Sequence, residues 1–214
     1  MISKKQYLRK LNNSLYVIID PDFCKQDPVK TALAAIKGGA RVFQLRCKKK
    51  SLGYTLNLAK KLSALCLKSG ALFIMNDRPD IAAKVKAGGV HVGQGDMPAL
   101  KAKCLFAGLI GVSAYNDKEI KRAMRDGVDY IGFGPVFKTS TKKGLPPVKG
   151  LKRLKRAAMR FKIPVVAIGG INESNIGSVF KAGAVSASLI SAVCSSSDPK
   201  QAVMDLLGRI REGV

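Results

Sequence analysis

Short apolar runs alternate with segments of helical periodicity along the whole chain. Eight runs predict buried strands, and they cover residues 15–19, 41–45, 71–75, 89–92, 109–113, 130–134, 165–169 and 185–190. Between them, residues 52–68 place apolar side chains on one helical face, and residues 117–126 predict a helix capped by Asp117. Eight strands with intervening helices predict an α/β fold, the closed parallel (β/α)8 TIM barrel.

The length of the chain suits one such domain. The chain has 214 residues, and barrels of this kind begin at about 200. We expect a single TIM-barrel domain over residues 1–214, in which residues 1–13 form a basic N-terminal extension. An open doubly wound sheet is the alternative, and it is disfavoured by the number of runs and by the lack of a G-x-G-x-x-G sequence after the first run.

Polar residues follow the second apolar run, at the edge of the sheet where α/β proteins bind ligands. Gln44, Arg46 and Lys48 stand at alternate positions there, so they share one face of an extended chain. Either they present an amide and two cations to the mouth of the barrel, or they belong to the solvated basic stretch that continues to Lys50.

Carboxylates follow the third and fourth runs. Asn76 and Asp77 come directly after one run, and Asp96 comes shortly after the other. Mg2+ is held in proteins by one or two carboxylates together with substrate phosphates and water, so Asp77 and Asp96 are candidate Mg2+ ligands. The alternative is that they only cap the helices expected near Pro79 and Pro98.

His91 and Ser113 lie within or at the end of strand-like runs. His91 is the only histidine, and we expect it to be a hydrogen-bonded core residue rather than a base. We expect Ser113 to have no histidine neighbour. It would then donate a hydrogen bond to a phosphate or a leaving oxygen rather than act as a nucleophile.

The loop over residues 134–144 is the longest irregular segment of the chain. Thr139, Thr141 and Lys142 offer hydroxyls and an ammonium that suit a diphosphate, and such a loop can also close over a site. An exposed polar connector is the alternative.

A second phosphate site is expected after the last two runs. Gly170 lets a ligand approach the backbone closely, and Ile190 and Ser191 follow the eighth run. These two loops form the frequent phosphate site of (β/α)8 barrels. The sequence therefore predicts a cationic, metal-assisted anion site and a separate backbone site for a phosphomonoester.

Charge and cysteine content narrow the function only slightly. The net charge is +24, but the charges are spread along the chain, so a basic nucleic-acid-binding module is kept as a distant alternative and no specific nucleic-acid partner is expected. No run approaches the ~18 apolar residues of a membrane span, and no membrane partner is expected. Five cysteines without a C-x-x-C pair favour a reducing, cytoplasmic location. The oligomeric state is left open.

The ordered set of motifs resembles the thiamine phosphate synthase family. The matching segments cover nearly the whole chain and are Gln44-Leu45-Arg46-Cys47-Lys48, Asn76-Asp77-Arg78-Pro79-Asp80, Gly89 to Asp96, Gly111-Val112-Ser113, Asp129 to Phe137, Thr139-Ser140-Thr141-Lys142, Ala167 to Ile171 and Ile190-Ser191-Ala192. The resemblance implies a TIM barrel that uses Mg2+ to join a hydroxymethylpyrimidine diphosphate to a thiazole phosphate by a dissociative mechanism.

The resemblance also assigns roles to the site residues. Asp77 and Asp96 would hold Mg2+, and Asn76 would bind the pyrimidine. The groups on the pyrimidine diphosphate would be Gln44, Arg46, Lys48, Ser113 and Lys142, of which Arg46, Ser113 and Lys142 are the catalytic candidates. The thiazole phosphate would meet Thr139, Thr141, Gly170, Ile190 and Ser191.

The chain departs from the commonest family pattern at Tyr115, where many members have histidine. Related thiazole tautomerases use a histidine in that region, so Tyr115 counts against tautomerase activity. A tautomerase-like or non-catalytic relative is the first alternative to the synthase.

Overall fold

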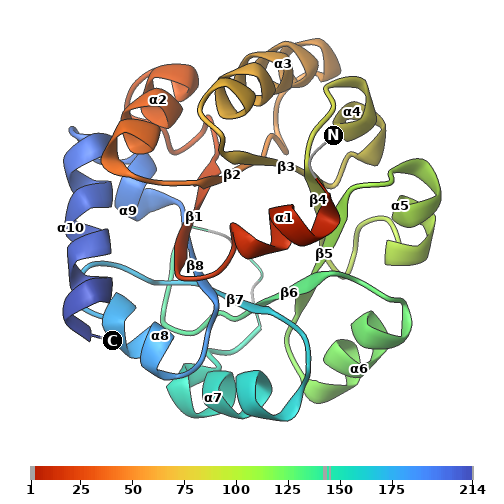
Figure 1. Cartoon of the computed structure of the whole chain (residues 1–214), viewed down its shortest axis with the longest axis vertical. Coiled ribbons are helices and arrows are strands. Elements are labelled where there is room, and N and C mark those ends of the chain that lie inside the picture. Colours follow the sequence, from red (N-terminus) through yellow and green to blue (C-terminus); the bar gives the residue numbers. More distant parts are fainter. Residues whose placement is uncertain (1–2, 142–143, 145, 214) are drawn as a thin grey trace.

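Eight parallel strands close into a barrel in the computed structural model, which describes residues 3–141, 144 and 146–213 (Figure 1). Each strand pairs with the next, and β8 pairs with β1. The strands are β1 Ser14–Ile19, β2 Val42–Leu45, β3 Leu72–Asn76, β4 Gly89–Val92, β5 Leu109–Ala114, β6 Tyr130–Phe133, β7 Val165–Ile168 and β8 Ser186–Leu189. The predicted (β/α)8 fold is confirmed.

Helices surround the barrel as an outer ring (Figure 1). They are α2 Pro28–Gly38, α3 Leu52–Lys68, α4 Pro79–Lys84, α5 Ala99–Leu105, α6 Asp117–Arg125, α7 Gly150–Arg160, α8 Ile176–Lys181, α9 Ser191–Cys194 and α10 Pro199–Gly213. None of the helices in the described ranges is long and apolar enough to cross a membrane.

The basic N-terminal segment contains a helix, α1 (Lys4–Arg9), which lies across the barrel in Figure 1. Leu11 just beyond it is fully buried in the cluster that fills the barrel interior. Lys10 donates to the carbonyl of Gly70 at 2.5 Å, and Lys4 pairs with Asp129 at 3.4 Å. Both partners precede strands, so α1 covers the N-terminal end of the barrel and leaves the opposite end open.

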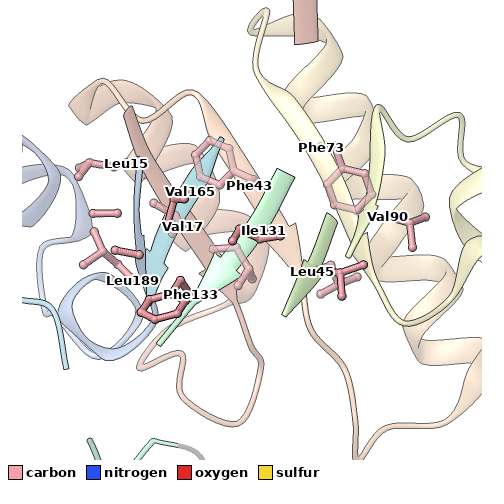
Figure 2. Close-up of a cluster of buried hydrophobic side chains, with 14 of the residues drawn as sticks. Leu15, Val17, Phe43, Leu45, Phe73, Val90, Ile131, Phe133, Val165 and Leu189 are labelled. Atoms are coloured by element: carbon pink, nitrogen blue, oxygen red, sulfur yellow. The ribbon is translucent and has the colours of Figure 1, made fainter. Parts of the chain in front are cut away.

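Two hydrophobic layers follow from the alternation of side chains along each strand. In β1, Leu15, Val17 and Ile19 belong to the large cluster between strands and helices, part of which is drawn in Figure 2. Tyr16 and Ile18 point the other way, into the cluster inside the barrel. The barrel interior is therefore a packed core that supports a site at its open end.

The predicted elements differ from the observed ones mainly at their ends. Helix α3 has the predicted bounds, whereas β2 begins one residue late and β6 ends one residue early. Asp117 was expected to cap α6, and this was wrong: the cap is Asn116, whose side chain accepts from the N–H of Glu119 at 3.0 Å. Asn116 is extended and so can reach the first turn, while the Asp117 carboxylate pairs with Arg156 and Arg160 of α7.

Candidate active site

A cavity opens at the C-terminal end of the strands and collects most of the predicted site residues. Those that line it are Gln44, Arg46, Asn76, Ser113, Thr139, Thr141, Gly170, Ile190 and Ser191. Lys48, Asp77 and Asp96 form a cluster next to it, since Asp77 directly follows Asn76 in the chain. Lys142 lies outside the described residues, so its place in the site stays a prediction.

Lys48 bridges the two candidate metal ligands. Its Nζ lies 2.6 Å from Asp77 Oδ2 and 2.9 Å from Asp96 Oδ1. The backbone N–H of Gly93 donates to the other oxygen of Asp96 at 3.0 Å, which fixes that carboxylate on its own loop. Asp77 has a φ of 63°, an uncommon value for a residue other than glycine and one that recurs at functional sites.

Neither carboxylate has the alternative role of a helix cap. The N-cap residue of α4 is Arg78, and that of α5 is Pro98. The capping interpretation of Asp77 and Asp96 was therefore wrong, because both carboxylates turn toward Lys48 instead.

The electrostatics of this cluster differ between its two acids. Burial raises the pKa of the Asp77 carboxyl, Lys48 opposes that effect, and the negative charge of Asp96 adds to it. At Asp96, burial acts in the same direction, but hydrogen bonds with Asp77 and Lys48 outweigh it and lower the pKa. Burial would lower the pKa of Lys48, yet the two carboxylates reverse the effect and raise it.

The same cluster fits a magnesium ion. Asp77 Oδ1 is buried and has no hydrogen-bond partner among the described residues, so an oxygen of the kind that Mg2+ prefers is left unused. Within the described ranges, no group of three or more His, Cys, Asp or Glu side chains could hold a metal. Mg2+ commonly takes one or two carboxylates as its protein ligands, and substrate phosphates and water complete its coordination shell.

Arg46 is oriented by a residue that the sequence reading missed. Asp20, which is 2% exposed, forms an ion pair with the Arg46 guanidinium, and the Arg46 backbone N–H donates to the carbonyl of Ile19 at 2.9 Å. Asp20 directly follows the apolar strand β1, which is the same signal that identified Asp77 after β3. The pair places a cation at the cavity wall with its carboxylate partner buried behind it.

A chain of hydrogen bonds crosses the upper interior of the barrel. Gln44 Nε2 donates to the Tyr16 hydroxyl at 2.7 Å, and Tyr16 is 2.9 Å from the hydroxyl of Tyr130. The Tyr130 hydroxyl is 3.2 Å from His91 Nδ1, and His91 Nε2 is 3.0 Å from Ser113 Oγ. We refer to these five residues as the hydroxyl–imidazole chain.

The hydroxyl–imidazole chain tests two expectations from the sequence, those for His91 and Ser113. His91 is a hydrogen-bonded residue within the barrel, as predicted. The expectation that Ser113 has no histidine neighbour was wrong, because pairing of β4 with β5 brings the two side chains together. Tyr16 and Tyr130 were not identified as site residues, since aromatic residues inside apolar runs read as core.

The opposite wall of the cavity is shaped by backbone. The segment after β6 runs beside the end of β7, where the N–H of Phe137 donates to the carbonyl of Gly169 at 3.0 Å. Gly170 has a φ of 64°, and a Cβ there would lie 2.8 Å from Phe137 Cβ. A side chain at Gly170 would therefore displace the segment after β6, which packs directly on its backbone.

The remaining residues of this wall carry hydroxyls and a short helix. Thr139 and Thr141 hold their hydroxyls 3.3 Å apart, and Ser191 begins α9 after the N-cap residue Ile190. Hydroxyls and backbone groups thus face the cavity from the side away from Lys48 and its two acids.

A (β/α)8 barrel with a cavity at the C-terminal end of its strands is the architecture of an enzyme. Here one side of the cavity has Arg46 and, next to the lining, the cluster of Lys48 with two carboxylates, and the other side has hydroxyls and backbone. The fold and the site together define a barrel enzyme whose site suits phosphorylated substrates.

Comparison with known proteins identifies the family. The family model described as thiamine monophosphate synthase matches residues 15–193. The thiamine-phosphate synthase of Methanocella arvoryzae is 45% identical over 195 residues, covering 90% of this chain and 92% of that protein. The corresponding protein of Archaeoglobus fulgidus is 41% identical over 198 residues, covering 92% and 93%. The chain belongs to the thiamine monophosphate synthase family and is a transferase.

A solved structure agrees with this assignment. The thiamine phosphate pyrophosphorylase of Pyrococcus furiosus superimposes with a TM-score of 0.86 at 35% identity, covering 95% of this chain and 98% of that one. The resemblance inferred from the motifs is confirmed.

Proposed function

We propose that the chain joins a hydroxymethylpyrimidine diphosphate to a thiazole phosphate, releasing thiamine phosphate and diphosphate. Family membership supports the reaction. The observation that carries the proposal furthest is the cluster in which Lys48 lies between Asp77 and Asp96, beside a cavity whose second wall is uncharged among the described lining residues. That arrangement suits one diphosphate and one monophosphate held side by side.

The pyrimidine diphosphate would occupy the charged side. Gln44 and Asn76 offer amide groups to the heterocycle, and Arg46 and Lys48 offer cations to the diphosphate. Asp20 holds the Arg46 guanidinium in place, so little ordering of that side chain is needed when the anion binds.

Catalysis would then consist of stabilising the leaving group and aligning two substrates. The bond between the pyrimidine methylene carbon and the diphosphate oxygen breaks, and the aminopyrimidine stabilises the resulting cation. Arg46, Ser113 and Lys142 offset the charge that develops on the departing diphosphate. The thiazole nitrogen then captures the methylene carbon. No nucleophile from the protein is required.

Mg2+ would be held by Asp77 and Asp96, and when bound it supplies positive charge that neutralises the diphosphate. Asp77 Oδ1 supports this assignment, because it has no hydrogen-bond partner within the described part of the chain. Lys48 now bridges both carboxylates, and in the complex its ammonium would be available to the diphosphate instead.

The thiazole phosphate would occupy the wall formed by hydroxyls and backbone. Thr139 and Thr141 supply hydroxyls, and the backbone at Gly170, Ile190 and Ser191 receives the phosphate. Gly170 supports this role because it lines the cavity without a side chain, so its backbone is open to the phosphate.

The proposal is tested by incubating the protein with both substrates and Mg2+ and looking for thiamine phosphate. A tautomerase-like or non-catalytic relative would form none. Tyr115, which lines the cavity where a tautomerase would need histidine, favours the synthase. A basic nucleic-acid-binding module would show duplex binding that survives moderate salt. We place the protein in the cytoplasm, with small molecules as its partners.

A further inference from the structure

The hydroxyl–imidazole chain links two residues on opposite sides of the cavity. Gln44 belongs to β2 and Ser113 to β5, and three buried or half-buried side chains connect them. Tyr130 and Tyr16 are 0% and 2% exposed, so water does not reach their hydroxyls freely. Each hydroxyl proton must therefore find an acceptor within the chain.

This requirement fixes which atom donates in each hydrogen bond of the hydroxyl–imidazole chain. An amide nitrogen can only donate, so the Tyr16 oxygen accepts from Gln44. The Tyr16 proton then goes to Tyr130, the other partner of that hydroxyl. The Tyr130 proton in turn goes to His91 Nδ1. A neutral imidazole that accepts at Nδ1 carries its proton on Nε2, so His91 donates to Ser113 Oγ.

The barrel is shaped to seat this chain. A Cβ at Gly111 would lie 2.5 Å from the Tyr130 hydroxyl, and a Cβ at Gly132 would lie 3.1 Å from His91 Cε1. The rings of Tyr16 and Tyr130 have centroids 6.2 Å apart, and those of Tyr130 and His91 are 5.6 Å apart. Gly111 thus provides the space that the Tyr130 ring needs, and Gly132 provides that of the His91 ring.

The ionisation of the phenols agrees with a neutral chain. Burial raises the pKa of Tyr130 well above its ordinary range, and the neighbouring Tyr16 adds to that effect. Burial likewise raises the pKa of Tyr16. Both phenols therefore keep their protons at neutral pH, and each hydroxyl can accept one hydrogen bond and donate the next.

We propose that the hydroxyl–imidazole chain couples the two ends of the site: with the Gln44 carbonyl oxygen facing the cavity, the Ser113 proton is directed away from His91 and goes to an anionic leaving group in place of its neighbour Tyr115. Tyr16, Tyr130 and His91 act as positioning residues. The proposal rests on the proposed function for the identity of the substrates. A pyrimidine amino group that donates to Gln44 would favour the orientation in which Ser113 donates to the diphosphate.

The first test is independent of activity. Because His91 is the only histidine, protein labelled with 15N in histidine gives the nitrogen signals of one imidazole. We expect Nδ1 to have the shift of an unprotonated nitrogen and Nε2 that of a protonated one. In Tyr130→Phe, which removes the donor to Nδ1, the two shifts should move toward each other. A proton on Nδ1 in the wild type, or unchanged shifts in Tyr130→Phe, would overturn the proposal.

The second test uses turnover. We expect Tyr130→Phe to lower kcat about tenfold with little change in KM, because it removes the hydroxyl that is hydrogen-bonded to Tyr16 and His91 and keeps the ring. In a Ser113→Ala background the same change should lower kcat less than about twofold, since its effect acts through Ser113. Equal losses in the two backgrounds would contradict the coupling. Tyr16→Phe serves if Tyr130→Phe does not fold, and Tyr54→Phe on α3, at a residue 43% exposed, is the matched control.

The two proposals fail separately. If the wild type forms no thiamine phosphate, the proposed function is wrong. The nitrogen shifts of His91 still show in which direction the hydrogen bonds of the hydroxyl–imidazole chain run. If product forms and the shifts place the proton on Nδ1, only the coupling is wrong.

Discussion

Asp77→Asn should stabilise the metal-free protein while removing its response to Mg2+. The wild-type carboxylate is buried, one of its oxygens has no partner among the described residues, and a second carboxylate stands close by. The amide keeps the shape of the side chain. Its oxygen can accept from Lys48, and its nitrogen can donate to Asp96.

The magnitude follows from the cost of an unsatisfied buried polar group, about 1–3 kcal/mol. Asparagine recovers part of this cost and still occupies a left-handed backbone position, so the expected gain in the free energy of unfolding is about 1 kcal/mol. For a chain of this size the gain corresponds to roughly 2–4 °C in Tm.

The pH dependence of this gain has a definite sign. The pKa of Asp77 is raised from its ordinary value of 3.8, so the folded wild type holds a proton that the unfolded chain releases as the pH rises. Wild-type stability therefore falls through the window above 3.8, while the variant has no such group. The advantage of Asp77→Asn should be absent below that window and complete above the raised pKa.

Thermal melts without divalent ions, followed by a Mg2+ titration, measure both effects. Mg2+ should raise the Tm of the wild type by mass action and leave that of Asp77→Asn nearly unchanged. Asp80→Asn is the matched control, because Asp80 is exposed and paired with Arg78, and its stability change should stay within about 0.5 kcal/mol. A variant Tm below that of the wild type at neutral pH would refute the reasoning from burial.

Other variants test the remaining parts of the site. Asp20→Ala breaks the ion pair of Arg46 and should cost about 3 kcal/mol in urea unfolding and raise KM for the pyrimidine diphosphate; unchanged values would exclude a positioning role. Gly170→Ala should raise KM for the thiazole phosphate, whereas Gly53→Ala, at an exposed helical glycine with open space around it, should leave that KM unchanged and slightly raise Tm. Lys142→Ala should lower kcat far more than it weakens thiazole phosphate binding, and normal turnover would remove its assigned role. Duplex DNA retained at low salt should be released at moderate salt, and retention at high salt would favour a nucleic-acid function.

The barrel could be predicted because its strands are buried on both faces. Runs such as residues 71–75 are almost continuously apolar, which is the mark of a parallel strand with helices on one side and a packed interior on the other. The ends of the strands were less predictable. Pairing decides where β2 begins and where β6 stops, and pairing depends on neighbours far away in the sequence.

The site residues at strand ends could be found for a related reason. A polar group directly after a buried run is conspicuous, and Asp77 was found in this way. Asp20 has the same signal after β1, and it was overlooked because Ile19 and Pro21 flank it directly, whereas Asp77 stands between the polar residues Asn76 and Arg78.

The contacts across the barrel could not be predicted from the sequence. Tyr16, Tyr130 and His91 come from β1, β6 and β4, and only closure of the barrel and its register bring them together. The position of Lys48 between two carboxylates likewise depends on where β2, β3 and β4 end relative to one another. Residues read as core or as solvated charge therefore became parts of the site.

In the proposed function, Asp77 and Asp96 hold Mg2+ while the two substrates are coupled in one cavity. This arrangement is tested most directly by incubating the wild-type protein with hydroxymethylpyrimidine diphosphate and thiazole phosphate, with Mg2+ and with a chelator. We expect thiamine phosphate and diphosphate in equal amounts with Mg2+ and almost none with the chelator. Equal product under both conditions would contradict the metal assignment, and no product under either would contradict the proposed function itself.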